Sequence, residues 1–227
     1  MKNIWSTLID IIFPINCLGC GKETHWLCQK CLKSIPLNQS CFCPICQKKQ
    51  STWGLCPNCQ KDRQLDGVII TADYHNKLLQ KLIFAYKYQF AFPLASPLSQ
   101  LIINYFAYNN LDPDFILTSL PLHQKRYKLR CFNQAELVTN YLADQFNLTF
   151  DPDLISRVKN TKPQARLNKK QRAINIQNAF TLNRGCYGRK ILIVDDVFTT
   201  GSTLNECAKL LKVAGAKEVW GLVIAQG

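Results

Sequence analysis

The sequence predicts an α/β protein in which helices cover both faces of a parallel sheet, behind a small cysteine-rich module. After residue 65, apolar runs typical of buried strands alternate with amphipathic helical patterns, and this alternation favours a parallel sheet. Before that point lie nine of the 12 cysteines, and eight of the nine form Cys-x-x-Cys pairs. We therefore expect two domains, residues 1–65 and 66–227.

The elements of the second domain follow from hydrophobic periodicity. Short apolar runs predict strands at residues 68–74, 115–121, 154–158, 190–196 and 218–225. Helical spacing of apolar residues predicts helices at residues 77–88, 94–108, 133–146, 168–177 and 201–216. A hydrophobic content of 47% is enough for a packed core.

The opening residues are apolar but predict neither a membrane span nor a signal peptide. No apolar run approaches the roughly 18–20 residues that a span needs. Asp10 interrupts the run, and no small-residue cleavage site follows. Because Trp5, Leu8, Ile9 and Ile12 recur at helical spacing, we expect a short amphipathic helix that covers the body of a cytoplasmic protein.

The cysteine pairs predict two structural Zn²⁺ sites. Two sulfurs three residues apart bind one ion together, and two such pairs complete a tetrahedron. Without a secretory signal, zinc is favoured over disulfides. Because thiolates fill every position, the ions would stabilise a segment poor in aliphatic residues rather than catalyse a reaction. The expected ligands are Cys17, Cys20, Cys28, Cys31, Cys43, Cys46, Cys56 and Cys59.

Two arrangements of these ligands remain open. Sequential pairing closes short loops and therefore costs the least chain entropy, whereas the similar loop lengths also allow a cross-braced arrangement. Cys41 and His25 stand outside the Cys-x-x-Cys pairs, and we expect neither to bind a metal ion. The module is either a folding clip or a binding surface for a protein or a nucleic acid.

The stretch "ILIVDDVFTTGSTL", residues 191–204, carries the strongest functional pattern. Asp195 and Asp196 end a buried strand, at the edge of a parallel sheet where ligands bind. The next turn opens a helix, whose free backbone N–H groups favour an anion, and Gly201 permits close approach. Hydroxyl groups line this turn at Thr199, Thr200, Ser202 and Thr203. Carboxylates beside a phosphate cradle suit the hydroxyls of a ribose 5-phosphate.

This stretch resembles the phosphoribosyl pyrophosphate (PRPP) binding motif of type I phosphoribosyltransferases. Together with "LPLHQKRYKLRCFNQAELV", "TKPQARLNKKQRAINIQNAF" and the cysteine pairs, it makes residues 17–225 resemble the ComF family, whose members are linked to DNA uptake in natural competence. The resemblance implies a type I phosphoribosyltransferase fold behind a zinc-ribbon-like domain. Cys131 replaces a glycine of the family, so a left-handed backbone there would have to change.

The resemblance also implies roles for individual residues. PRPP would bind with Mg²⁺, while Asp195 and Asp196 hold the ribose and stabilise the positive charge that grows near its C1. Lys125 and Arg126, expected on a loop after the strand at 115–121, would contact the leaving pyrophosphate. The segment 161–172 would close as a lid.

Basic residues outnumber acidic ones, 28 to 15, which indicates a polyanionic partner. From Arg157 to Lys190 there are ten Lys or Arg and no acid, whereas solvated faces usually mix signs. This block could be a lid over pyrophosphate or a track for single-stranded DNA, with Tyr127 and Phe132 stacking on bases. Candidates for either role are Arg130, Lys162, Gln164, Arg166, Lys169, Lys170 and Arg172.

Two functions therefore compete. One is a PRPP-binding phosphoribosyltransferase that acts in competence. The other is a non-enzymatic factor that handles single-stranded DNA and retains the PRPP-binding fold. A PRPP-sensing regulator is less favoured, because no helix-turn-helix pattern occurs. As a binding surface, the zinc module would recruit other competence proteins.

Overall fold

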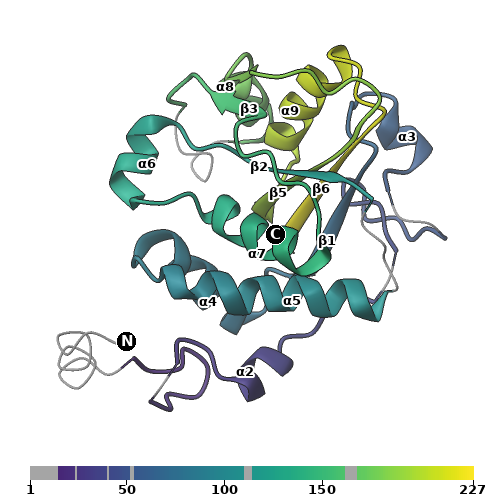
Figure 1. The fold of residues 1–227 in the computed structure, drawn as a ribbon. Coiled ribbons are helices and arrows are strands. Elements are labelled where there is room, and N and C mark those ends of the chain that lie inside the picture. Colours follow the sequence, from purple (N-terminus) through teal and green to yellow (C-terminus); the bar gives the residue numbers. More distant parts are fainter. Residues whose placement is uncertain (1–14, 24, 40, 52–53, 110–113, 162–167) are drawn as a thin grey trace.

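The computed structural model describes residues 15–23, 25–39, 41–51, 54–109, 114–161 and 168–227 (Figure 1). The amphipathic helix expected at the start of the chain lies outside the described residues. So do the lid candidates Lys162, Gln164 and Arg166.

The core of the fold is a parallel four-stranded sheet with the strand order β1-β6-β5-β2. The strands are β1 (Gly67–Asp73), β2 (Ile116–Ser119), β5 (Lys190–Phe198) and β6 (Glu218–Gln226). A separate antiparallel pair joins β3 (Ile155–Arg157) to β4 (Phe180–Leu182). The predicted α/β class with a parallel sheet is confirmed.

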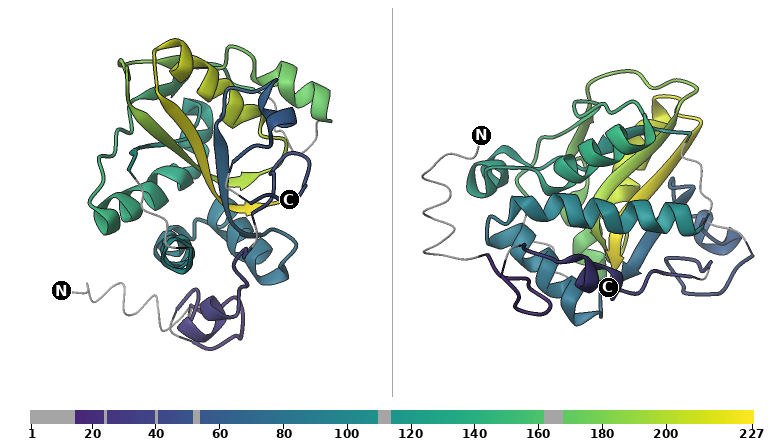
Figure 2. Two further views of the ribbon diagram at one scale, coloured as in Figure 1. Left: turned by 90° about the vertical axis from the view of Figure 1, so that its right-hand side faces the viewer. Right: turned by 60° about the horizontal axis from the view of Figure 1, so that its bottom comes forward.

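Helices cover both faces of this sheet (Figures 1 and 2). One face carries α4 (Lys77–Tyr88), the short 3₁₀ helix η1 (Phe92–Leu94), α5 (Ala95–Tyr108) and α7 (Gln134–Phe146). The other face carries α9 (Ser202–Val213), on which α8 (Lys169–Ile176) and the β3–β4 pair are packed. The expected helices therefore form, each shorter than or equal to its predicted range.

The central strand β5 shows why the sheet needs two covering layers. Leu192 and Val194 belong to the core cluster beneath α4, α5 and α7, whereas Ile191 and Ile193 belong to the cluster beneath α9. All four side chains are at most 1% exposed. Because successive residues of a strand point to opposite faces, an uninterrupted apolar run indicates burial on both sides.

The two cysteine-rich segments pack against opposite sides of this body. The first contains α2 (Gln29–Lys33), and its residues Leu27, Leu32 and Ile35 join the cluster with α4 and α5. The second contains α3 (Pro57–Gln60), and its apolar side chains pack on the α9 cluster. In Figure 1, α2 accordingly lies below α5, whereas α3 lies at the upper right, beyond the end of β1 that is farther from α2.

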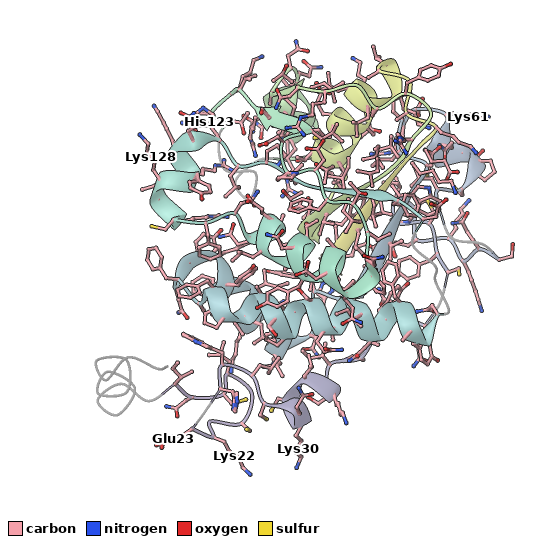
Figure 3. All side chains as sticks on the ribbon, viewed as in Figure 1. Lys22, Glu23, Lys30, Lys61, His123 and Lys128 are labelled. Carbon is pink, nitrogen blue, oxygen red and sulfur yellow. The ribbon has the colours of Figure 1, made fainter. Side chains whose placement is uncertain are left out.

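The prediction that Lys125 and Arg126 lie on a loop is wrong, because they belong to α6 (Gln124–Arg130). His123 caps this helix, since its Nδ1 accepts a hydrogen bond of 3.2 Å from the amide of Lys125. The helix buries none of its residues, so no apolar periodicity could reveal it. Figure 3 shows His123 and Lys128 projecting outward from it.

Candidate functional site

A cleft of about 1000 Å³ opens at the carboxyl end of β5, bounded by α4, α6, β3 and the start of α9. It brings together most of the side chains predicted to bind ligand. Those lining it are Asp195, Asp196, Thr199, Gly201, Ser202, Thr203, Arg126, Arg130 and Arg172. Thr200 does not line the cleft, and its hydroxyl meets that of Ser202 at 2.9 Å. Lys125 is exposed and does not line the cleft.

The two adjacent carboxylates lie in different surroundings, because neighbouring residues of a strand point to opposite faces. Asp196 faces the α4 side, where the ammonium of Lys87 meets its Oδ1 at 2.8 Å. Both side chains of this ion pair are largely buried, at 20% and 13% exposure. Asp195 faces the α9 side, within electrostatic range of Arg157 and Cys207. The acids therefore differ in partner.

The carboxyl of Asp195 has an unusually high pKa because it is shielded from water. Desolvation and the neighbouring charge of Asp196 raise its pKa to about 7, against the opposing effects of Lys87 and Arg157. The backbone amide of Asp196 also donates a hydrogen bond of 2.8 Å to Asp195 Oδ1. Asp195 consequently changes its protonation state near neutral pH.

The loop between β5 and α9 has the geometry of an anion site. Gly201 caps α9 with a left-handed backbone, at a φ of 71°. A Cβ at this position would lie 2.7 Å from the ring of Phe198, so only glycine fits. The twelve-residue helix then presents its first free N–H groups and its positive dipole end to the cleft.

Sequence reasoning did not single out Arg157, which also lines the cleft. Its guanidinium donates a hydrogen bond to the hydroxyl of Thr161, whose carbonyl oxygen accepts one of 2.8 Å from Arg126. Burial and the charge of Arg126 lower the pKa of Arg157 to about 10. Within the described part of the chain, its buried Nε has no hydrogen-bond partner. In the sequence, the only indication that Arg157 binds a ligand is its position in the acid-free block.

Several other cations of the acid-free block have partners elsewhere. Arg184 pairs with Asp151 at 3.2 Å, and Lys190 pairs with Asp114 at 2.9 Å. Lys159 donates to the carbonyl oxygen of Gln177 at 3.0 Å. The block is thus not one continuous track, because acids from distant segments neutralise part of it.

Exposed rings surround the mouth of the cleft on the α4 side. Phe84, Tyr88 and Phe90 line it and are 54%, 59% and 57% exposed. The guanidinium of Arg130 lies 5.3 Å from the centre of the Tyr88 ring, a cation–π geometry. Phe132, predicted to stack on bases, instead packs between the rings of Tyr86 and Phe92, although its edge reaches the cleft.

The eight paired cysteines form two groups, and each group joins pairs that are consecutive in the sequence. Within a group, all four sulfurs lie within 4.8 Å of one another. The Cys20–Cys28 and Cys46–Cys56 sulfur separations are 3.8 and 3.7 Å, and a tetrahedral Zn²⁺ with bonds of about 2.3 Å requires edges of about 3.8 Å. The groups therefore fit two structural zinc ions in sequential pairing.

One buried cysteine in each group has a lowered pKa that favours metal binding, whereas neighbouring thiols and burial raise the pKa of Cys31 and Cys59 to about 12. Burial alone would raise the pKa of Cys17 and Cys43, but hydrogen bonds from backbone amides outweigh it and lower both to about 6. Zinc binds the thiolate form, so this shift suits a ligand. Cys41 and His25 belong to neither of these two groups.

Comparison with known proteins defines the class of this molecule. Residues 8–63 match the double zinc ribbon domain, and residues 133–226 match the phosphoribosyl transferase domain. The protein is therefore a phosphoribosyltransferase-like domain behind a double zinc ribbon.

Whole-chain relatives identify the family. The chain is 32% identical to Competence protein F of Haemophilus influenzae, over 94% of this chain and 98% of that protein. It is 32% identical to the DNA utilization protein YhgH of Escherichia coli and 26% identical to Competence protein ComFC of Bacillus subtilis, over 86% of this chain in each case and 96% and 81% of those proteins. The chain belongs to the ComF family. Among the described residues, no helix is long and apolar enough to cross a membrane.

Proposed function

We propose that the cleft binds PRPP, or another ribose 5-phosphate ligand, and that the protein is a PRPP-binding phosphoribosyltransferase-like factor in the uptake of DNA for transformation. One observation carries the proposal: two carboxylates face the same cleft as the glycine-capped start of α9. Carboxylates accept hydrogen bonds from ribose hydroxyls, and a helix N-terminus binds phosphate.

Different residues of the cleft bind different parts of the ligand. The amides and hydroxyls of the loop from Thr199 to Thr203 bind the 5′-phosphate. Asp195 and Asp196 accept hydrogen bonds from the ribose hydroxyls. Their negative charge stabilises the positive charge that develops near C1 as its bond to the pyrophosphate oxygen breaks.

The pyrophosphate of PRPP needs cations on the opposite side of the cleft. Arg126 and Arg157 supply them there, and Arg157 has a buried donor that an anion would satisfy. Mg²⁺ would be held by the phosphate oxygens of the ligand, which it prefers, and would keep several of its waters. The segment 161–172 would close over these groups and exclude water.

The relatives support the proposed role of this chemistry in DNA handling. Proteins similar to this one over most of its length are named for competence and for DNA utilization. We expect the protein to work in the cytoplasm, where reducing conditions keep the paired cysteines available for zinc.

Calorimetry tests ligand binding. Wild type should bind PRPP in the presence of Mg²⁺, and the double variant D195N/D196N should lose binding, because neither amide carries the charge that the ribose site needs. D144N, which alters an exposed aspartate on α7, is the matched control. Equal PRPP affinity in wild type and D195N/D196N would exclude the assignment. Pyrophosphate release with candidate acceptors then tests turnover.

A second function is favoured by the exposed rings at the mouth of the cleft. Phe84, Tyr88 and Phe90 offer flat faces beside Arg130, and single-stranded nucleic acids bind to this combination of rings and cations. In this function the protein holds single-stranded DNA along the α4 side without necessarily transferring a phosphoribosyl group.

Fluorescence anisotropy with a labelled oligothymidine tests this second function. Y88A should weaken binding by about 1–3 kcal/mol through the loss of one stacked base. Y108A is the control, because Tyr108 is similarly exposed, at 58%, but does not line the cleft. The logarithm of affinity should fall steeply with the logarithm of salt concentration. Binding insensitive to both Y88A and salt would exclude this function.

A further inference from the structure

Lys87 occupies an unusual position for a lysine. It extends from the last turn of α4 into the carboxyl end of the sheet and lines the cleft. Its ammonium lies 2.8 Å from Asp196 Oδ1, in a pair whose side chains are 20% and 13% exposed. Lysine is almost never buried unless it is paired, so this contact specifies the position of the side chain.

The lysine lies outside the segment that defines the phosphoribosyltransferase class. That match covers residues 133–226, whereas α4 precedes it in the chain. Lys87 therefore places a positive charge beside Asp195 and Asp196, and this charge comes from outside the matched segment.

Electrostatics explain why the acids need such a partner. Asp195 is partly buried beside Asp196, and two adjacent carboxylates with little access to water do not both stay ionised readily without a counter-charge. Burial acts to lower the pKa of Lys87, but the charge of Asp196, its hydrogen bond to the ammonium and the charge of Asp195 together outweigh burial and raise the pKa. The ammonium thus stays charged and offsets one of the two carboxylates.

We propose that Lys87 is a positioning residue of the ribose site, which holds Asp196 ionised and oriented for a ribose hydroxyl. By engaging Oδ1, it leaves Oδ2 to accept the hydrogen bond from the sugar. Its charge also reduces the repulsion between the acid pair and the phosphates of an incoming ligand. This inference rests on the proposed ribose phosphate function.

The opposite role for Lys87 is a plug that the ligand must displace. A plug would compete with ribose for Asp196, so its removal would tighten binding. A positioning residue predicts the reverse, and the direction of the change in affinity therefore separates the two.

Calorimetric titration of wild type, K87M, K87R and K81M with PRPP and Mg²⁺ tests the inference. K87M should weaken binding by about tenfold or more, because truncating one partner of a buried charge pair leaves the other unpaired. K87R keeps the charge and should recover most of the affinity. K81M removes an exposed lysine of the same helix and should bind as wild type does.

Two further measurements keep the result interpretable. The same loss should occur with ribose 5-phosphate, because the effect acts at the sugar rather than at the pyrophosphate. If K87M does not fold, as judged by circular dichroism, K87Q replaces it, since its neutral amide, on a side chain one atom shorter, keeps a hydrogen-bond donor without the charge.

The outcomes distinguish this inference from the function on which it rests. Wild-type binding together with equal or tighter binding by K87M, or by K87Q in its place, overturns the inference and leaves the proposed function intact. A wild type that binds neither PRPP nor ribose 5-phosphate overturns both.

Discussion

Asp195 and Asp196 are neighbours in the chain but have different chemistry. The pleat of β5 turns one toward α9 and the other toward α4. Asp196 meets a lysine there, whereas Asp195 is partly buried, and desolvation raises its pKa to about 7. At the scale of a residue, the site is thus an asymmetric pair.

The raised pKa of the Asp195 carboxyl predicts a pH-dependent stability. Because its pKa is raised in the folded state, its stabilising contribution is present at low pH and is lost as the pH rises through about 7. The amide of D195N does not ionise, so this loss of stability with rising pH does not occur in the variant. Between pH 6 and pH 8, the free energy of unfolding of D195N should therefore rise by about 1 kcal/mol relative to that of wild type. Urea denaturation at both pH values measures it, and D144N should follow wild type.

Cys131 shows that a side chain can occupy a backbone conformation suited to glycine. The expected change of local geometry does not occur, because Cys131 ends α6 with a φ of 63° and its amide donates to the carbonyl oxygen of Tyr127 at 2.7 Å. The left-handed conformation that glycine adopts freely is thus kept, at a cost in strain.

C131G should therefore stabilise the protein by about 1 kcal/mol, since glycine relieves the left-handed strain. The control is N147G at the end of α7, where the φ is 52° but asparagine tolerates this conformation. N147G should stabilise the protein against thermal unfolding by less than C131G does. An equal or larger gain for N147G would contradict the explanation.

At the scale of the element, the loop from β5 to α9 combines a buried ring with a left-handed backbone that glycine allows. Phe198 packs under Gly201, and this contact sets the point at which α9 begins. The first amides of the helix therefore face the cleft.

G201A should disturb this loop in two ways. Its Cβ would clash with Phe198, and alanine disfavours a φ of 71°. We expect a loss of at least about 2 kcal/mol in stability, and weaker PRPP binding. G185A is the control, because nothing lies within 4 Å of a Cβ there. Chemical denaturation and calorimetry on both variants check the prediction.

At the scale of the whole molecule, the second zinc ribbon supports the candidate site directly. The amide of Gln64 donates to Asn205 in the second turn of α9 at 2.9 Å, and Gln226 at the end of β6 donates to the carbonyl oxygen of Pro44 at 2.7 Å. The guanidinium of Arg63 lies beside Gly201. The first ribbon packs instead on α4 and α5.

The two zinc sites should therefore affect PRPP binding unequally. C56S, which removes a ligand of the second site, should weaken binding by about tenfold, because small displacements at a distance misplace binding groups. C28S, the matching change in the first site, should have a smaller effect on binding. Zinc content by mass spectrometry and PRPP affinity measure both. Equal losses in affinity would show that the ribbons act only through overall stability.

Local patterns account for the parts of the molecule that sequence reasoning predicted. The helix at residues 77–88 was predicted because its 3.6-residue period repeats over many residues, and strand β5 was predicted because an uninterrupted apolar run leads into Asp195 and Asp196. Helix α6 was not predicted, because none of its residues is buried, and a helix without buried residues leaves no periodic signal. Strand β4, of three residues, was not predicted either.

By itself, the sequence determined the order of the elements, the zinc ligands and the place of the acids and hydroxyls, because each depends on spacing within a few residues. Only the tertiary structure decided which distant groups meet. It paired Lys87 with Asp196, turned Arg157 into the cleft and set the second ribbon against α9. Such contacts depend on strand order and on which helix covers which face of the sheet, and no local pattern in the chain records either.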